Sequence, residues 1–161
     1  MRGVRGEDLE ALARLNDAAV PNVNALGLEG LAAHVRRCEL ALTVEHGGEP
    51  AALLLALAPG SDYESENYLW FAEHQEPSLY VDRIVVSEAL RSRGVGAALY
   101  EHVIAHAVGS GLGLVTCEVN LDPPNPRSLA FHERLGFREV GRQHTGGGST
   151  HVVLLARPTT G

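Results

Sequence analysis

The chain has 161 residues, of which 45% are hydrophobic and 20% charged, and its formal net charge is -7. This length and composition predict one compact domain with a proper hydrophobic core, spanning residues 1–161. The net negative charge argues against binding to a nucleic-acid backbone, which favours a basic face, so we expect no nucleic-acid partner. We also see no signal peptide and no apolar run that could cross a bilayer, so we expect no membrane partner and a cytoplasmic location.

The first half of the chain predicts two helices and a hairpin. Apolar residues at helical spacing indicate helices over residues 7–20 and 28–37, and Pro21 ends the first. Strand-like runs at 40–45 and 51–57 flank two glycines, which favours a hairpin. Residues 59–78 break these patterns, and we interpret them as a long loop that holds the only tryptophan.

The stretch from 79 to 99 organises the rest of the chain. Residues 79–86 are apolar or β-branched on both alternating faces, as is typical of a strand covered on both sides. A basic loop with Gly94 and Gly96 follows, and apolar spacing then predicts a helix from Val95. Free N–H groups at a helix start, the helix dipole and nearby arginines favour a phosphate or pyrophosphate. An ordinary glycine-rich turn is the alternative.

A second strand and helix follow the same order. Residues 113–119 indicate a buried strand and residues 120–124 a loop, after which Asn125 and Pro126 form a strong helix start. Residues 137–143 and 151–157 then predict a closing hairpin. We therefore predict an α/β (α+β) fold, in which a mixed sheet carries helices on both faces.

Two of these stretches resemble the GNAT superfamily of N-acetyltransferases. Residues 91–96, RSRGVG, are similar to its Arg/Gln-x-x-Gly-x-Gly/Ala pyrophosphate loop. Residues 117–119 and 125–137, CEV and NPRSLAFHERLGF, are similar to its L-E-V and N-x-x-A/S-x-x-x-Y-E-K/R-L-G-F signature. With the flanking strands, the resemblance covers nearly the whole chain. Within the superfamily, the chain resembles more narrowly a bacterial branch of predicted acetyltransferases.

The resemblance implies a mostly antiparallel sheet, splayed between its two central strands, that binds acetyl-CoA as the acyl donor. We expect no metal cofactor. It implies that Ile84, Val85 and Val86 pair with the pantetheine arm through their backbone. It assigns the pyrophosphate to the glycine loop, formed by Arg91, Ser92, Arg93, Gly94, Val95 and Gly96. Asn125, Ser128 and Phe131 would face the cofactor from the next helix.

Acetyl transfer to an amine requires removal of the amine proton, stabilisation of an oxyanion and protonation of the thiolate. Glu118 is the expected base, because burial in a strand would raise its pKa and because it matches a base position of the family. A carboxylate paired with an arginine is the alternative for Glu118. Asp82 is the rival base, and we expect the adjacent Arg83 on the opposite face of its strand.

The expected general acid departs from the family pattern. Where the family usually has a tyrosine on the helix after the second strand, this chain has His132. An imidazole can protonate a thiolate near neutral pH, so His132 is the expected acid. Tyr80 or water could take this role instead, and a packing or cofactor-contact role is open for His132.

The acceptor site has no comparable motif. In the family the first helices and the first long loop usually shape it, which implies Asn24, Asp62, Tyr63 and Trp70. Acids among aromatic rings suit an amine on an organic body. We therefore predict an N-acetyltransferase that uses acetyl-CoA to modify a small amine or a protein amino group, with a homodimer as one expected assembly. A non-catalytic acyl-CoA-binding domain and an interaction module are the alternatives.

Overall fold

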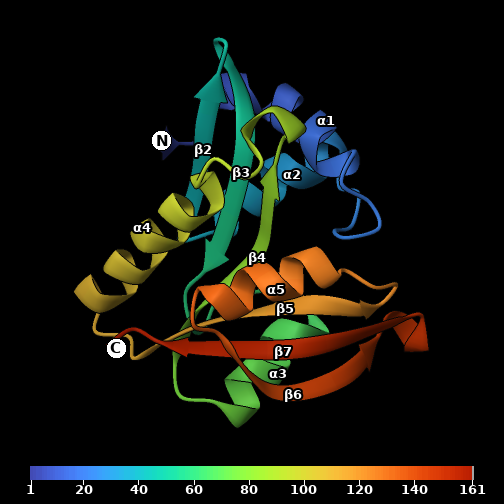
Figure 1. The fold of residues 1–161 in the computed structure, drawn as a ribbon, viewed down its shortest axis with the longest axis vertical. Helices are drawn as coiled ribbons and strands as arrows, with labels where there is room; N and C mark the ends of the chain where they lie inside the picture. Colours follow the sequence, from blue (N-terminus) through green and yellow to red (C-terminus); the bar gives the residue numbers. More distant parts are fainter. Residues whose placement is uncertain (161) are drawn as a thin grey trace.

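The computed structural model describes residues 1–160, which form a seven-stranded sheet with helices on both faces (Figure 1). The strands are Arg2–Gly3 (β1), Leu40–His46 (β2), Glu49–Leu57 (β3), Ser78–Val86 (β4), Leu114–Asp122 (β5), Arg138–Thr145 (β6) and Thr150–Pro158 (β7). The helices are Leu9–Asp17 (α1), Gly27–Arg37 (α2), Glu66–His74 (α3), Val95–Gly109 (α4) and Pro126–Arg134 (α5). Short 3-10 turns lie at Gly6–Asp8, Glu88–Leu90 and Gly146–Gly148.

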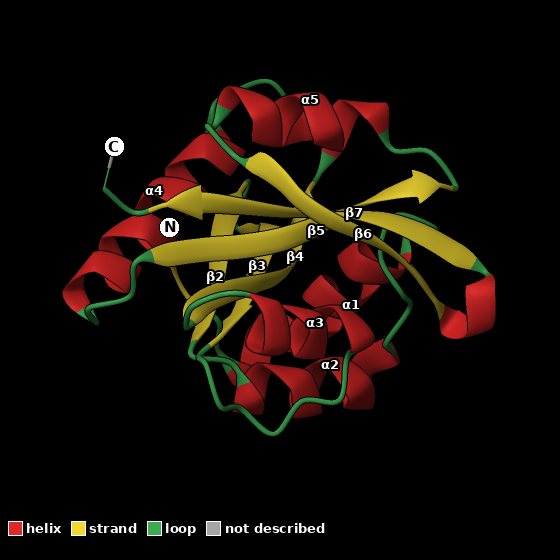
Figure 2. Ribbon diagram, turned by 90° about the horizontal axis from the view of Figure 1, so that it is seen from below, coloured by secondary structure: helices red, strands yellow, loops and turns green. Residues whose placement is uncertain are grey.

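The sheet has the order β1-β2-β3-β4-β5-β7-β6, and every neighbouring pair is antiparallel except β4 with β5. Helices α4 and α5 cover one face, and α1, α2 and α3 cover the other (Figure 2). The prediction of a mixed, mostly antiparallel sheet between two layers of helices is therefore confirmed. No helix within residues 1–160 is long and apolar enough to span a membrane.

Strand β3 shows why both helical layers are needed. Its residues from Ala51 to Leu57 are buried on both faces of the sheet. Leu53 and Leu55 pack with α1 and α2, whereas Leu54 belongs to the core beneath α4. A strand without a polar face can be stable only when both of its faces are covered, so the apolar run in the sequence already required two layers.

The two central strands separate soon after they meet. Residues 78–81 of β4 pair with residues 114–117 of β5, and the ladder ends there. Beyond this point β4 continues beside β3 and β5 continues beside β7, so the two halves of the sheet diverge (Figure 1). The outer half of β4 therefore presents backbone N–H and C=O groups without a strand partner toward the gap.

The prediction of a loop over residues 59–78 is wrong, because α3 lies within this segment. The apolar side chains of this helix are consecutive from Tyr68 to Phe71, which hides any helical periodicity in the sequence. Tyr68 and Phe71 are buried against Tyr80 of β4, whereas Leu69 is exposed. Strand β5 is also longer than expected, since it extends beyond residue 119 to Asp122.

Glycine at position 141 leaves room for Trp70 to lie against β6. A Cβ atom at this position would lie 2.5 Å from Cζ2 of the indole. We therefore expect Gly141→Ala to lower the free energy of unfolding by about 1–3 kcal/mol, because the ring must move. Chemical denaturation tests this, with Gly109→Ala as the control, because a Cβ there meets nothing within 4 Å. Equal losses in both variants would show that the Trp70 contact is not the cause.

Candidate active site

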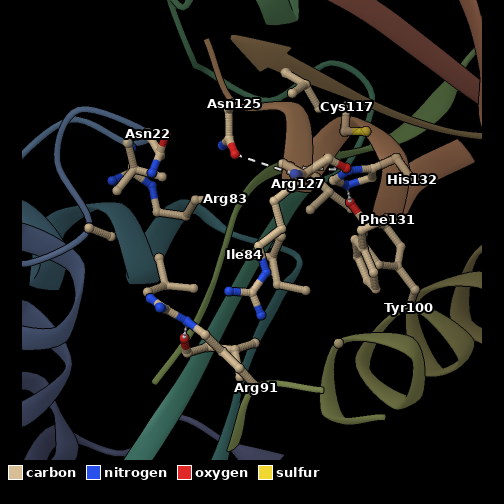
Figure 3. Close-up of a pocket in the computed structure, with 18 of the residues that line it drawn as sticks. Asn22, Arg83, Ile84, Arg91, Tyr100, Cys117, Asn125, Arg127, Phe131 and His132 are labelled. Carbon is tan, nitrogen blue, oxygen red and sulfur yellow. Dashed lines mark hydrogen bonds between the residues drawn. The ribbon is translucent and has the colours of Figure 1, made fainter. Parts of the chain in front are cut away.

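A first cavity of about 530 Å³ lies between the free side of β4, the glycine loop and α5 (Figure 3). The sequence-predicted cofactor residues that line it are Ile84, Val85, Val86, Arg91, Ser92, Gly94, Val95, Gly96, Asn125, Ser128 and Phe131. Arg93 is exposed and does not line the cavity. The structure thus brings together residues from β4, α4 and α5 that lie far apart in the sequence.

The two glycines of the loop have different structural roles. Gly94 adopts a left-handed conformation with φ of 78° at the N-cap of α4, and no side chain caps the first N–H groups of that helix. Gly96 lies against α5, since a Cβ atom there would be 2.9 Å from Cζ of Phe131. Gly94 therefore permits the turn and Gly96 the close packing, and the uncapped helix start remains available to an anion.

Arg127 is a cavity residue that sequence reasoning missed. It lies in the first turn of α5, and Figure 3 shows its side chain and that of Arg91 reaching toward one another from opposite walls. Arg91 donates to the carbonyl of Val86 and to Glu88. Within residues 1–160, Arg127 makes no side-chain hydrogen bond or ion pair. Its position immediately before Ser128 in the signature helix was the available signal.

A second cavity, of about 490 Å³, opens on the opposite side of the gap. Its walls come from residues 21–24 between α1 and α2, the start of α3, and the end of the β6–β7 hairpin. Both cavities are lined by Asn22, Val23, Asp82, Arg83, Glu118 and Asn120. The two cavities therefore meet where β4 and β5 separate.

The residues expected to bind the acceptor divide into two groups. Asn24 and Tyr63 line the second cavity. Asp62 and Trp70 line neither cavity: Asp62 is exposed, and the Trp70 ring stacks on His74 at a centroid distance of 4.4 Å. Trp70 thus covers the sheet, and Tyr63 is the aromatic residue of the second cavity.

Glu118 lies at the junction of the cavities and is held by Tyr80. The Tyr80 hydroxyl donates a 2.8 Å hydrogen bond to Oε2 of Glu118. Removal from water, together with the negative charge of Asp82, raises the pKa of Glu118 to about 8 despite the hydrogen bonds from Tyr80 and Asn67. Tyr80 lines neither cavity, and burial raises its own pKa well above the ordinary value, so it remains a donor.

Asp82 has a buried carboxylate whose oxygens are fully engaged. Oδ2 accepts from Nε2 of His34 at 2.9 Å and from Nε of Arg83 at 2.8 Å, and Oδ1 accepts from the Tyr63 hydroxyl at 2.7 Å. Burial alone would raise the pKa of Asp82, but the His34 hydrogen bond and the Arg83 charge outweigh it and lower this pKa to about 2. Asp82 is therefore ionised, and His34 and Arg83 are site residues that sequence reasoning missed.

The expectation that Arg83 points away from Asp82 is wrong. Arg83 pairs with Leu55 of β3, whereas Ala56 pairs with Val81, so Asp82 is the extra residue of a β-bulge. A bulge disturbs the strict alternation of side chains along a strand. Arg83 can therefore bond its own neighbour, and it also donates to Asn16 of α1 at 2.9 Å.

His132 is buried with both ring nitrogens engaged inside the protein. Nδ1 faces the carbonyl of Ser128 at 2.8 Å and therefore carries the proton, so Nε2 accepts from the Tyr100 hydroxyl at 2.7 Å. Burial lowers the pKa of His132 despite the Ser128 carbonyl, which favours the neutral ring. Both His132 and Tyr100 line the first cavity, and sequence reasoning missed Tyr100.

Comparison with known families identifies the fold and the class of protein. The model of the acetyltransferase (GNAT) family matches residues 13–137. The chain belongs to the GNAT family of acetyltransferases. A search of curated proteins finds no match to this chain. The resemblance drawn from the glycine loop and the α5 signature is therefore confirmed.

Solved structures share this GNAT fold at low sequence identity. The ribosomal-protein-S18-alanine N-acetyltransferase of Escherichia coli is 20% identical, with a TM-score of 0.70 over 99% of this chain and 93% of that chain. Ard1 of Thermoplasma volcanium is 15% identical, with a TM-score of 0.76 over 98% and 95%. The protein yncA of Salmonella typhimurium, solved with its cofactor acetyl-CoA, is 15% identical, with a TM-score of 0.69 over 99% and 93%.

The opposite environments of Asp82 and Glu118 predict opposite responses to the same chemical change. Asp82→Asn leaves the buried Arg83 without its carboxylate, so we expect a loss of about 3–5 kcal/mol in the free energy of unfolding at neutral pH. Because folding lowers the pKa of Asp82, the contribution of this carboxylate to stability disappears as the pH falls toward 2. The free energies of unfolding of the wild type and of Asp82→Asn should then converge. Denaturant titrations at several pH values measure this.

Glu118→Gln is the matched control for Asp82→Asn. Folding raises the pKa of Glu118, so its contribution to stability is greatest at low pH and is lost as the pH rises through about 8. The Glu118→Gln substitution should therefore leave stability unchanged or improve it in alkaline buffer. If Asp82→Asn were as stable as the wild type at neutral pH, this would contradict the claim that the Asp82 carboxylate balances the charge of Arg83.

Proposed function

We propose that this GNAT protein transfers the acetyl group of acetyl-CoA to a primary amine of a small molecule or polypeptide. The cofactor occupies the first cavity and the acceptor the second. One observation carries the proposal: the two cavities meet at the gap between β4 and β5, and Glu118 lines both of them. A proton acceptor at that junction can reach an amine that approaches the acyl group from the far side.

The first cavity fits acetyl-CoA. The free backbone groups of β4 suit the amides of a pantetheine arm, and the apolar side chains of Ile84 and Phe131 suit its carbon chain. The uncapped start of α4, with Arg91 and Arg127, suits the phosphates. When bound, acetyl-CoA supplies an acetyl group activated as a thioester.

Glu118 is the general base of this proposal. An amine must lose a proton to complete the transfer, and a carboxylate with a pKa of about 8 can accept that proton near neutral pH, directly or through water. The Tyr80 hydrogen bond fixes the direction of the carboxylate. Asp82 is a weaker choice, because its oxygens are already engaged and its pKa is about 2.

His132 acts as a positioning residue in the proposed mechanism. Its neutral ring holds the Tyr100 hydroxyl at the wall of the first cavity through the 2.7 Å hydrogen bond. Neither group is a strong acid, since burial lowers the pKa of His132 and raises that of Tyr100. A thiol has an ordinary pKa of about 8.5, so its thiolate leaves readily, and the proton that Glu118 accepted from the amine can return to it through water in the cavity.

Replacing the base should change both the rate and its pH dependence. We expect Glu118→Gln to lower kcat by about 100- to 10,000-fold while the KM for acetyl-CoA stays unchanged. In the wild type kcat/KM should rise with pH and level off above about 8, because Glu118 must be ionised to accept a proton. Thiol release is measured for the wild type and for Glu118→Gln with the same acceptor amine. Titration of that amine affects both pH profiles, so an inflection present in the wild type alone reports Glu118.

The same assay distinguishes the competing functions. Full activity in Glu118→Gln would contradict the assignment of the base. A wild-type protein that binds acetyl-CoA but releases no thiol with any amine would instead support a non-catalytic acyl-CoA-binding domain. Absence of acetyl-CoA binding would overturn the proposed use of the first cavity.

Arg127 should contribute to binding of the cofactor phosphates. A charge-assisted hydrogen bond stabilises a complex by about 1.5–3 kcal/mol, so Arg127→Gln should raise the Kd for CoA about 10- to 100-fold. Affinity for acetyl-pantetheine, which lacks the phosphates, should not change. Isothermal titration calorimetry measures both ligands. Arg93→Gln is the matched control, because Arg93 is exposed and lies outside the cavity; equal effects of the two variants would argue for a nonspecific charge effect.

A further inference from the structure

The second cavity is lined mainly by polar side chains, and several of them have no hydrogen-bond partner within residues 1–160. Within residues 1–160, the side chains of Asn22, Asn24, Ser65, Thr145 and Thr150 line it and make no hydrogen bond. None of their polar atoms is buried away from solvent, since Ser87 alone has such an orphaned atom in the described chain. These groups are therefore free to bond to a molecule in the cavity.

The apolar side chains of the second cavity are few. Pro21, Val23 and Val152 are its aliphatic lining residues and Tyr63 adds one aromatic ring, whereas the first cavity includes Ile84, Val85, Val95 and Phe131. An alkyl or aromatic group beside the acceptor amine would gain little burial and would remove water from polar groups without replacing its hydrogen bonds. The lining therefore disfavours acceptors whose amine is attached to an apolar body.

Hydrogen bonds connect α3 to the β6–β7 hairpin in the wall of the cavity beside these polar groups. Gln143 donates to Asn67 at 2.7 Å, and the backbone N–H of Gly146 donates to Glu66 at 3.2 Å. Glu66 lines the cavity, and Asp82 there offsets the charge of Arg83. The negative charge of Glu66 favours entry of an ammonium group, and the hydrogen bonds between α3 and the hairpin hold the cavity-lining residues of the hairpin in place.

We propose that the acceptor is a primary amine whose neighbouring atoms carry hydroxyl or amide groups. The polar side chains bind those groups, and Glu118 receives the amine proton. This inference rests on the proposed acetyl transfer and adds the chemical class of the acceptor. The same chemistry can come from a free amino alcohol derivative or from a polypeptide that begins with serine or threonine.

Threonine and valine provide the direct test, because their side chains have nearly the same shape and differ in one hydroxyl. Thiol release is measured with threonine amide, valine amide and two matched peptides that begin with threonine or valine. We expect kcat/KM to be at least about tenfold higher for the threonine member of a pair, since a site built for hydrogen bonds discriminates against the analogue that lacks one. The more active pair identifies the free or polypeptide source.

Each outcome bears on a different claim. Transfer with equal or greater kcat/KM for valine would overturn the inference while upholding acetyl transfer. No thiol release with any of the four amines, despite binding of acetyl-CoA, would count against the proposed function and this inference together.

A paired variant tests whether the cavity wall causes the preference. Thr145 and Thr150 are cross-strand partners at the end of the hairpin. Thr145→Val combined with Thr150→Val should reduce the threonine preference about 3- to 10-fold, as expected for lost hydrogen bonds of ordinary strength. Thr160→Val is the control, because this exposed residue lines neither cavity. An unchanged preference in the double variant would overturn the inference.

Discussion

The short pairing between β4 and β5 is the constraint on which the rest of the structure depends. Only residues 78–81 and 114–117 form that parallel ladder, and each strand is then held by its antiparallel neighbour on the other side. Each half of the sheet therefore keeps its own hydrogen bonds while a gap opens between them. A continuous ladder would join the backbone groups that now face the first cavity and would separate the two cavities from each other.

The chemistry at the gap depends on two carboxylates that lie in different environments. Asp82 is ionised because His34, Arg83 and Tyr63 surround it, and its charge in turn helps raise the pKa of Glu118. Neighbouring groups whose pKa values are pushed apart are typical of sites that separate binding from proton transfer. The buried network around Asp82 therefore stabilises the fold and adjusts the proposed base at the same time.

Local sequence patterns were sufficient for the parts of the site that local structure determines. The turn at Gly94 and the helix start at Asn125 are short-range features, and Asn125 does accept a hydrogen bond from the N–H of Ser128 as a cap. The bulge at Asp82 could not be predicted in this way, because it arises from the pairing of β4 with β3. Likewise, His34 bonds to Asp82 across 48 positions of sequence, and no periodicity within α2 indicates that partner.

The same distinction separates the donor side of the site from the acceptor side. The first cavity is built largely from the glycine loop and the α5 signature, which are the segments whose sequence motifs suggested the family. The second is built from residues 21–24, the start of α3 and the end of the hairpin, which are connecting segments held on a rigid sheet. Such segments can change without disturbing the gap or the base. The polar lining of the second cavity is supplied by these connecting segments, and it is the feature of this chain from which the acceptor can be inferred.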